Sequence, residues 1–213
     1  MAILTDIIVH HFGGVGNDAH ASTQHFTVED IARAHKERWN FPSQYIKGEL
    51  GYVGYHFVIE DNGIITQCRA LGEESAHCKG HNFTSVGIAL AGNFNVGTDT
   101  PTEAQIKSLK RLLITLVEGK RSIIEQYIVA PNTVFNFSGS RIFPHREFSQ
   151  TDCYGWILTH YWARNLYIGY LSEKLRLLQD LIKLFFALKN TVRGIKPMPG
   201  RAGDDDRECS GSL

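Results

Sequence analysis

Two short segments, far apart in the sequence, carry side chains that could hold a metal ion. The first is the apolar run Ile7–His11, which ends in His10 and His11. The second contains His145 and, eight positions later, Cys153. Two imidazoles and one thiolate are ligands that zinc prefers, and a catalytic zinc site keeps a fourth position open for water. The sequence therefore predicts a zinc hydrolase.

The residues alone leave one of the ligands open. Successive residues of a strand point to opposite faces of a sheet, so only one of His10 and His11 can face the ion.

Hydrophobic patterns predict the strands that must position these ligands. Short apolar runs rich in β-branched residues favour strands at 4–11, 55–60, 64–68 and 85–91. Asp61–Gly63 contains Asn-Gly, which is a strong hairpin signal between the second and third of these strands. Tyr127–Val129 is a further candidate strand within a segment that otherwise resembles a loop.

Periodic apolar positions predict helices at 27–39, 100–118 and 152–167. Thr27 is the expected N-cap of the first helix, and Thr100–Glu103 is the expected capping box of the second, with Pro101 at its first helical position. Strands interspersed with helices indicate an α/β (α+β) fold in which helices flank a central mixed β-sheet.

The last part of the chain differs from the rest. Residues 171–196 carry six Lys or Arg and two acidic residues. One helical face of this segment holds Leu171, Leu175, Leu178, Ile182 and Phe185. We expect a catalytic domain at 1–166, a basic amphipathic C-terminal helix at 167–196 and a disordered tail at 197–213. Three roles fit the helix: packing on the domain, contact with anionic membranes, or self-association.

Composition limits the partners and the compartment. The 22 basic and 22 acidic residues balance, so no basic field indicates nucleic acid. The beginning of the sequence lacks the pattern of a signal peptide, and no run approaches the length of a membrane span. Four cysteines without C-x-x-C spacing do not form a disulfide scaffold. We expect a protein that is synthesised and folded in a cytoplasm.

Four collinear segments resemble one known family. They are IIVHHFGG, GYHFVIEDNGIITQCRALGEESAHCKGHNFTSVGIALAGNF, TPTEAQIKSLKRLL and HREFSQTDCYG, and the similarity extends from about residue 5 to residue 165. They are similar to the zinc-dependent N-acetylmuramoyl-L-alanine amidases, which include phage lysozyme-type amidases and animal peptidoglycan recognition proteins. The resemblance implies the fold of that family and bacterial peptidoglycan as the substrate.

The resemblance also implies roles for single residues. His10, rather than His11, matches the first zinc ligand of the family, and His145 and Cys153 match the second and third. Some members of the family have an aspartate near this point, so the resemblance makes Asp152 a rival third ligand, but the Thr-x-Cys pattern places Cys153 ahead of it.

Three further positions match residues of the family's cleft. Tyr55 matches a catalytic tyrosine whose phenol can donate a hydrogen bond to the developing oxyanion. Thr151 matches a position whose hydroxyl could donate to the tetrahedral intermediate. His77 matches a cleft histidine that contacts substrate or transfers a proton. The remaining residues of interest are expected to be structural: Asn82, Asn93, His20, His25, His35, His56, His81 and His160.

Two departures from the family pattern bear on function. Ala89 stands where a cytosolic branch has a glutamate that acts as general base, and Tyr154 stands where proline usually follows the cysteine. The sequence therefore favours a monomeric phage endolysin that accumulates in the host cytoplasm and acts on the cell wall after release. The alternatives are a cytosolic amidase that recycles muropeptides and a module that binds peptidoglycan without cutting it.

Overall fold

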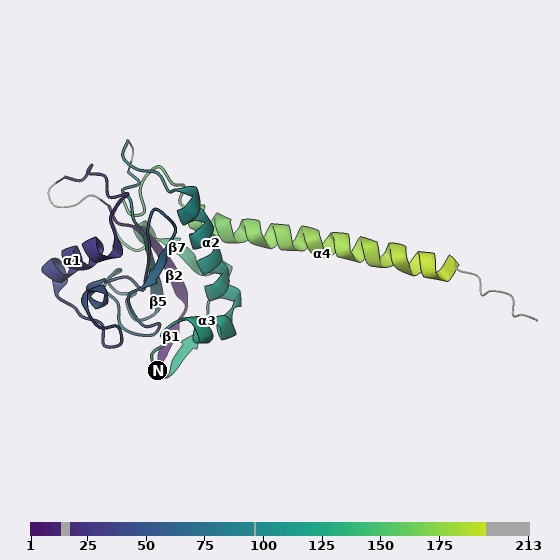
Figure 1. Cartoon of the computed structure of the whole chain (residues 1–213), viewed down its shortest axis with the longest axis horizontal. Coiled ribbons are helices and arrows are strands. Elements are labelled where there is room, and N and C mark those ends of the chain that lie inside the picture. Colours follow the sequence, from purple (N-terminus) through teal and green to yellow (C-terminus); the bar gives the residue numbers. More distant parts are fainter. Residues whose placement is uncertain (14–17, 96, 195–213) are drawn as a thin grey trace, which may run out of the picture. The chain divides into compact units, whose positions relative to one another are not determined.

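The computed structural model describes residues 1–13, 18–95 and 97–194 (Figure 1). The chain divides into two compact units, Met1–Leu171 and a second that begins at Ser172. The expected division into a catalytic domain, a helix and a tail stays a prediction. The predicted tail at 197–213 lies outside the described residues.

A mixed sheet of five strands forms the centre of the first unit. Its order is β4-β3-β5-β2-β7. All neighbouring strands are parallel except β3 and β4, which are antiparallel, so the predicted mixed sheet is confirmed. The strands are β2 (Asp6–His11), β3 (Phe57–Ile59), β4 (Ile65–Gln67), β5 (Ser85–Leu90) and β7 (Ile142–Pro144).

The predicted strand at 4–11 is in fact two strands in two sheets. β1 (Ala2–Leu4) pairs in parallel with β6 (Thr133–Phe135), and the chain then passes to β2 after Thr5. The predicted hairpin is confirmed, since β3 and β4 are joined through Asp61–Gly63. Gly63 has a φ of 83° there, a conformation that favours glycine.

Helices cover both faces of the sheet (Figure 1). On one face α1 (Val28–Trp39) packs against Val58 and Ala89. On the other, α2 (Glu103–Glu118) and α3 (Lys120–Gln126) pack against the alternate residues of the same strands. The strands β2, β3 and β5 are therefore buried on both faces, which explains their nearly continuous apolar sequences.

The cap of α1 is as predicted and the cap of α2 is not. Thr27 caps α1 and forms a capping box with Asp30. The N-cap of α2 is Thr102, which forms its box with Gln105, so the helix begins after Pro101. The Gln105 amide is buried and also donates to the carbonyls at the ends of β3 and β5, which fixes the register of the helix on the sheet.

The predicted helix at 152–167 is wrong in its first half. Residues 152–161 form turns, and α4 (Trp162–Gly194) begins only after them. The Arg146 guanidinium donates to the Gly155 and Leu158 carbonyls, so side chains replace the hydrogen bonds that a helix would supply. Gly155 has a φ of 88°, which is incompatible with a helix.

Two other predictions on secondary structure need correction. Tyr127–Val129 is not a strand: the short helix α3 ends just before it, and Val129 forms only an isolated bridge with Leu71. The predicted C-terminal helix is continuous with the last helix of the catalytic part, because α4 has no break near residue 167. Short 3₁₀ turns occur at Glu49–Tyr52, Gly139–Arg141 and His145–Glu147.

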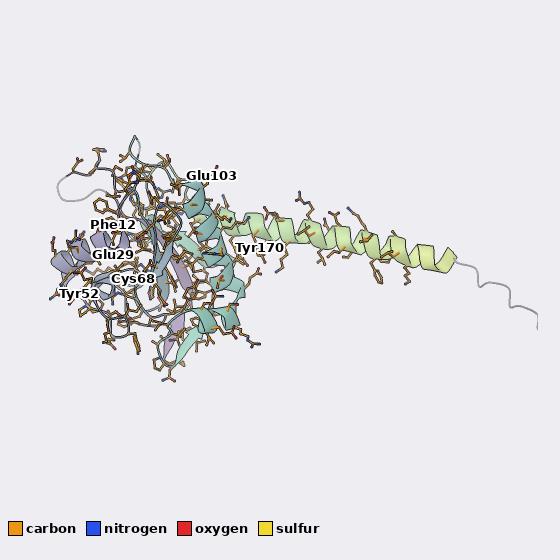
Figure 2. All side chains as sticks on the ribbon, viewed as in Figure 1. Phe12, Glu29, Tyr52, Cys68, Glu103 and Tyr170 are labelled. Carbon is orange, nitrogen blue, oxygen red and sulfur yellow. The ribbon has the colours of Figure 1, made fainter. Side chains whose placement is uncertain are left out.

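The beginning of α4 belongs to the core of the first unit. The hydroxyls of Tyr167 and Tyr170 both donate to the Glu118 carboxylate at the end of α2. Tyr170 lies near the start of α4 (Figure 2). Farther along, the large apolar side chains from Leu171 to Leu188 are exposed. Among the described residues, no helix has both the length and the apolar character that a membrane span requires.

Candidate active site

The carboxyl ends of two parallel strands bring the first two predicted ligands together. β7 lies directly beside β2, with Val9 opposite Pro144 in register. His10 is near the end of β2, and His145 is the residue that follows β7. The centroids of the two imidazole rings are 4.5 Å apart. The sheet topology thus explains how residues 135 positions apart in sequence become neighbours.

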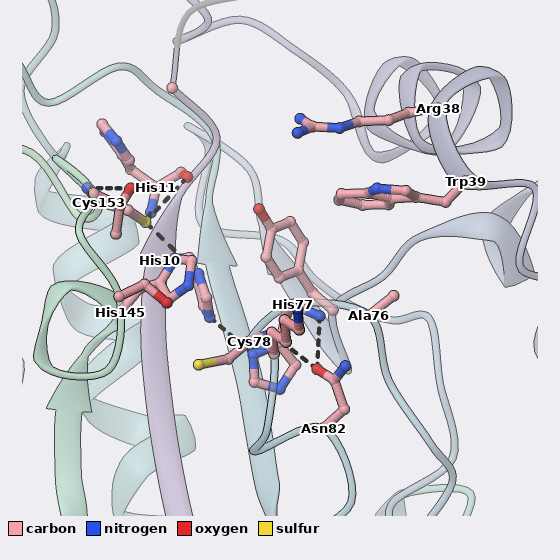
Figure 3. A pocket seen from close by; sticks show the side chains of 15 residues that line it. His10, His11, Arg38, Trp39, Ala76, His77, Cys78, Asn82, His145 and Cys153 are labelled. Carbon is pink, nitrogen blue, oxygen red and sulfur yellow. Dashed lines mark hydrogen bonds between the residues drawn. The ribbon is translucent and has the colours of Figure 1, made fainter.

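Cys153 reaches the same point from the loop that follows His145. The Arg146 amide donates to the Cys153 carbonyl at 3.0 Å, which closes this loop. The Cys153 Sγ accepts from the His11 amide at 3.4 Å and lies 3.6 Å from the His10 Nδ1 (Figure 3). One potential ligand atom from each of His10, His145 and Cys153 lies within 4.8 Å of the other two.

The side chains of the two rival ligands are engaged with other partners. The His11 Nδ1 accepts a hydrogen bond from the Phe94 amide at 2.8 Å, so this ring is turned toward the core on the α2 side. Asp152 is exposed, and its carboxylate accepts from the Trp156 indole at 2.7 Å. Among the described residues, the converging group contains neither of them.

Burial sets the charge state of the group. Desolvation, followed by the neighbouring histidines His77 and His145, holds the pKa of His10 well below its usual value. Desolvation also lowers the pKa of His145. It raises the pKa of the Cys153 thiol to about 12, although the His11 amide and Arg146 favour the thiolate. The metal-free group is therefore two neutral imidazoles and a neutral thiol.

The composition of this group fits a zinc ion. Neutral imidazoles can bind a metal without losing a proton, and a thiol becomes a ligand by releasing one. Nitrogen and sulfur donors suit zinc, whereas magnesium and calcium prefer oxygen. Three converging protein donors leave room for a fourth ligand, as catalytic zinc sites require.

The group lies at the floor of a cleft of about 530 Å³. Arg38 and Trp39, from the end of α1, form the opposite wall, and the Arg38 guanidinium lies 4.9 Å from the centre of the Trp39 ring (Figure 3). Among the described residues that line the cleft, Arg38 and Lys79 are cationic and none is acidic. The lining is formed by His10, His11, Gly13, Arg38, Trp39, Tyr55, Ala76, His77, Cys78, Lys79, Asn82, His145, Ser149, Thr151 and Cys153.

Tyr55 and Thr151, both predicted as catalytic, line this cleft. The Tyr55 ring lies 5.0 Å from the His10 ring and 5.2 Å from the His35 ring. Burial, followed by the nearby Cys153, raises the pKa of the Tyr55 phenol, so the hydroxyl keeps its proton. The Thr151 Oγ1 accepts from the Cys153 amide at 3.3 Å, which leaves the hydroxyl proton available as a donor.

His77, the third predicted catalytic residue, also lines the cleft but is almost completely buried. Its Nδ1 lies 3.0 Å from the His10 Nε2, and its Nε2 lies 3.3 Å from the Ser85 Oγ. Both ring nitrogens therefore have partners within the protein. The Asn82 Oδ1 accepts from the His77 and Cys78 amides, which is the structural role expected of Asn82.

Several residues at the site were not identified from the sequence. Arg38 and Trp39 form a wall of the cleft, and Arg146 closes the loop that carries Cys153. The only available signal for Arg38 and Trp39 was their place in the last turn of a predicted helix. His35, assigned to the core, accepts from the Gly54 amide at 2.9 Å and so supports the backbone beside Tyr55.

Comparisons with known proteins identify the family to which the sequence is similar. A family model described as N-acetylmuramoyl-L-alanine amidase matches residues 3–156. The endolysin of Escherichia phage T7 is 27% identical over 146 residues, which cover 67% of this chain and 79% of the relative. Peptidoglycan-recognition protein SC2 of Drosophila melanogaster is 32% identical over 113 residues, or 52% of this chain and 53% of the relative.

Among solved structures, the N-acetylmuramoyl-L-alanine amidase LysC from Clostridium intestinale URNW is similar, with a TM-score of 0.43 and 24% identity. The match covers 72% of this chain and 88% of that one. The family match spans more than half of the sequence and includes the strands and cleft described above. The chain therefore belongs to the N-acetylmuramoyl-L-alanine amidase family and is an enzyme that hydrolyses bacterial peptidoglycan.

Proposed function

We propose that this amidase is a zinc-dependent phage endolysin. It cuts the amide bond between the lactyl group of N-acetylmuramic acid and L-alanine, which detaches peptide stems from glycan strands. The observation that carries the proposal is the convergence of His10, His145 and Cys153 at the floor of an open cleft. The family match and the similarity to a phage endolysin support it.

The three converging residues would hold the metal ion. When bound, zinc supplies a Lewis acid that polarises the scissile carbonyl and lowers the pKa of a water to about 7. His10 and His145 are neutral and ready to bind, whereas Cys153 has to release its proton. Nearby Arg146 favours the resulting thiolate.

Tyr55 and Thr151 stabilise the charge that develops on the carbonyl oxygen during attack. Tyr55 remains a phenol because burial raises its pKa, so it can donate a hydrogen bond at any physiological pH. The Thr151 hydroxyl is oriented by the Cys153 amide and has its own proton to donate. Donors that are fixed before the reaction stabilise such charge without having to reorganise.

The departing amine of L-alanine needs a proton. His77 is poorly placed to supply it, since His10 and Ser85 occupy both of its ring nitrogens. Tyr55 or a water molecule therefore provides this proton.

The structural setting of the site favours an enzyme that acts on intact wall. Ala89 pairs with His10 in register and is completely buried, so this strand carries no carboxylate that could act as the general base of recycling amidases. All three ligand positions are retained, which argues against a module that only binds. The enzyme would accumulate in the cytoplasm of the host and reach the wall after release.

The test uses purified sacculi and zinc-loaded protein. Wild type should clear the suspension and release new N-terminal alanine, whereas Cys153→Ser should do neither. Cys68→Ser is the matched control, because Cys68 is also buried and its thiol donates to the Thr66 carbonyl, away from the metal group. Activity on soluble muropeptides but not on sacculi would support a recycling amidase. Tight binding of sacculi without release of alanine would contradict an enzyme.

The exposed part of α4 gives the endolysin a second contact. Leu175, Leu178, Ile182 and Phe185 lie on one helical face and are all about half exposed. Four basic and two acidic residues occur between Leu171 and Lys189, so this segment has a net positive charge. We place this face against anionic membrane lipids, with the enzyme acting as a monomer.

Vesicle flotation tests this contact. The full chain should float with phosphatidylglycerol vesicles and not with phosphatidylcholine vesicles. A Leu178→Ser/Ile182→Ser variant should lose the binding, whereas Ser172→Ala on the polar face should retain it. If the wild type ignores both vesicles and sediments as an oligomer, α4 mediates self-association and the membrane contact is wrong.

A further inference from the structure

A buried chain of hydrogen bonds leads away from His10 on the side opposite to Cys153. The His10 Nε2 lies 3.0 Å from the His77 Nδ1, and the His77 Nε2 lies 3.3 Å from the Ser85 Oγ. The Ser85 hydroxyl in turn donates to the His81 carbonyl at 2.7 Å. His10, His77 and Ser85 are all buried, so water does not compete for these bonds.

The end of this chain determines where every proton lies. A carbonyl can only accept a hydrogen bond, so the Ser85 hydroxyl donates its single proton to the His81 carbonyl. The Ser85 oxygen is then an acceptor toward His77. His77 must then donate from Nε2. A neutral imidazole has one N–H group, which makes the His77 Nδ1 an acceptor. His10 must therefore donate from Nε2.

The consequence for His10 is a fixed tautomer. With its proton on Nε2, the ring presents the lone pair of Nδ1, and Nδ1 is the atom that lies 3.6 Å from the Cys153 Sγ. The opposite tautomer would place a proton on Nδ1 and remove this nitrogen as a ligand. A hydrogen bond to the second nitrogen of a ligating histidine commonly fixes its tautomer and its orientation.

The fold also fixes the position of the His77 ring. Asn82 anchors the His77 backbone through its side-chain oxygen, as the dashed line in Figure 3 shows. The ring lies against β5 at Gly87, where an added Cβ would come within 2.5 Å of the His77 Cδ2. Gly87 is therefore required for the close approach that joins His77 to Ser85, two residues earlier on the same strand.

We propose that His77 and Ser85 are positioning residues that hold His10 in the tautomer that binds the metal. This proposal rests on the proposed zinc site, and it assigns to His77 a role other than contact with the substrate. Outer partners of this kind typically change metal affinity about 10- to 100-fold when they are removed.

The first measurement is the tautomer of His10 in the metal-free protein, read from two-bond ¹H–¹⁵N correlations. We expect a proton on Nε2 in the wild type and a mixture of tautomers in His77→Ala. A His10 ring protonated at Nδ1 in the wild type would overturn the proposal. This readout does not depend on zinc, so it separates the proposal from the proposed function.

The second measurement is zinc affinity, determined by competition with a chromophoric chelator. His77→Ala should bind zinc about 10- to 100-fold more weakly, and Ser85→Ala should show a smaller loss. His77→Asn places an amide oxygen close to the position of Nδ1 and should restore most of the affinity, and Ser85→Thr should resemble the wild type.

Catalysis at saturating zinc supplies the last criterion. His77→Asn should then show an unchanged KM, because the residue does not touch the substrate. If the variants bind zinc as the wild type does and instead raise KM, His77 contacts substrate and the proposal is wrong. Failure of the wild type to bind zinc would contradict the proposed function, and the tautomer measurement would still decide on the positioning role.

Discussion

The two walls of the cleft are built in opposite ways. The wall that carries the predicted metal ligands takes its residues from segments up to 143 positions apart and buries most of them. The opposite wall consists of Arg38 and Trp39, which are adjacent in sequence, lie in the last turn of α1 and are exposed. One wall depends on the sheet topology, and the other needs only the end of one helix.

This difference follows from what each wall has to do. Ligand atoms must converge to within a few tenths of an ångström, and parallel strands with a closed loop provide that precision. Recognition of a large polymer tolerates adjustment, and long side chains on a helix end can adapt to it. Changes to the buried wall should therefore abolish the reaction, whereas changes to the exposed wall should alter substrate affinity.

Tyr55 lies between the two walls and gives the sharpest test of this division. Tyr55→Phe keeps the ring between His10 and His35 and removes only the hydroxyl. Because loss of one preorganised donor to a developing oxyanion costs about 10²- to 10³-fold, we expect kcat to fall by that factor. Zinc content and KM should change little. Rates on soluble muropeptide and metal analysis provide the measurements.

The control is Tyr52→Phe, at a tyrosine whose ring contacts the Lys36 ammonium outside the cleft. This variant should retain the wild-type rate. Loss of zinc from Tyr55→Phe would show that the hydroxyl supports the metal group and would contradict a role in the transition state.

Acid should destabilise the fold through histidines that lie outside the metal group. Burial, followed by nearby arginines, lowers the pKa of His35 to about 3, and burial followed by Arg69 lowers the pKa of His56 to about 3. In the unfolded state these histidines bind protons near pH 6.5. Their contribution to the free energy of unfolding is therefore complete above that pH and is lost as the pH falls toward 3. Within that window, each of the two histidines should lower the free energy of unfolding by about 1.4 kcal/mol per pH unit.

Urea unfolding of the metal-free protein between pH 7 and pH 4.5 measures this slope. His35→Asn keeps an acceptor near the position of Nδ1 for the Gly54 amide and should reduce the slope by about one proton. An unchanged slope in His35→Asn would show that His35 does not contribute.

The buried wall was the more predictable one, although its residues are far apart. His10, His145 and Cys153 are side chains with distinctive chemistry, and strand alternation already required a choice between His10 and His11. The mixed sheet and the helices at α1 and α2 likewise follow from local apolar patterns and caps. These features can be predicted because metal-ligating side chains, periodic apolar residues and cap residues each have few other roles where they occur.

The features that sequence did not show depend on tertiary contacts. Turns replace a helix at 152–161 because the Arg146 guanidinium donates to backbone carbonyls there and Gly155 adopts a positive φ. No sequence pattern in that segment indicates these contacts. The pairing of His77 with His10 and Ser85 requires three segments to meet. In the sequence, Arg38 and Trp39 are not distinguishable from other residues at exposed helix ends, and only the folded structure places them in the cleft.

Arg38 tests the exposed wall and should show the smallest effect. Its guanidinium lies over Trp39 in a cleft without acidic lining residues among those described, so it can attract the carboxylates of a stem peptide. An exposed charge pair contributes about 0.2–1 kcal/mol, which predicts that Arg38→Ala raises KM about 1.4-fold to fivefold without changing kcat. The difference should shrink at high salt, because ions screen exposed charges. Arg33→Ala, on the same helix and paired with Asp30, should have no effect, and an equal rise in its KM would show that helix charge in general is responsible.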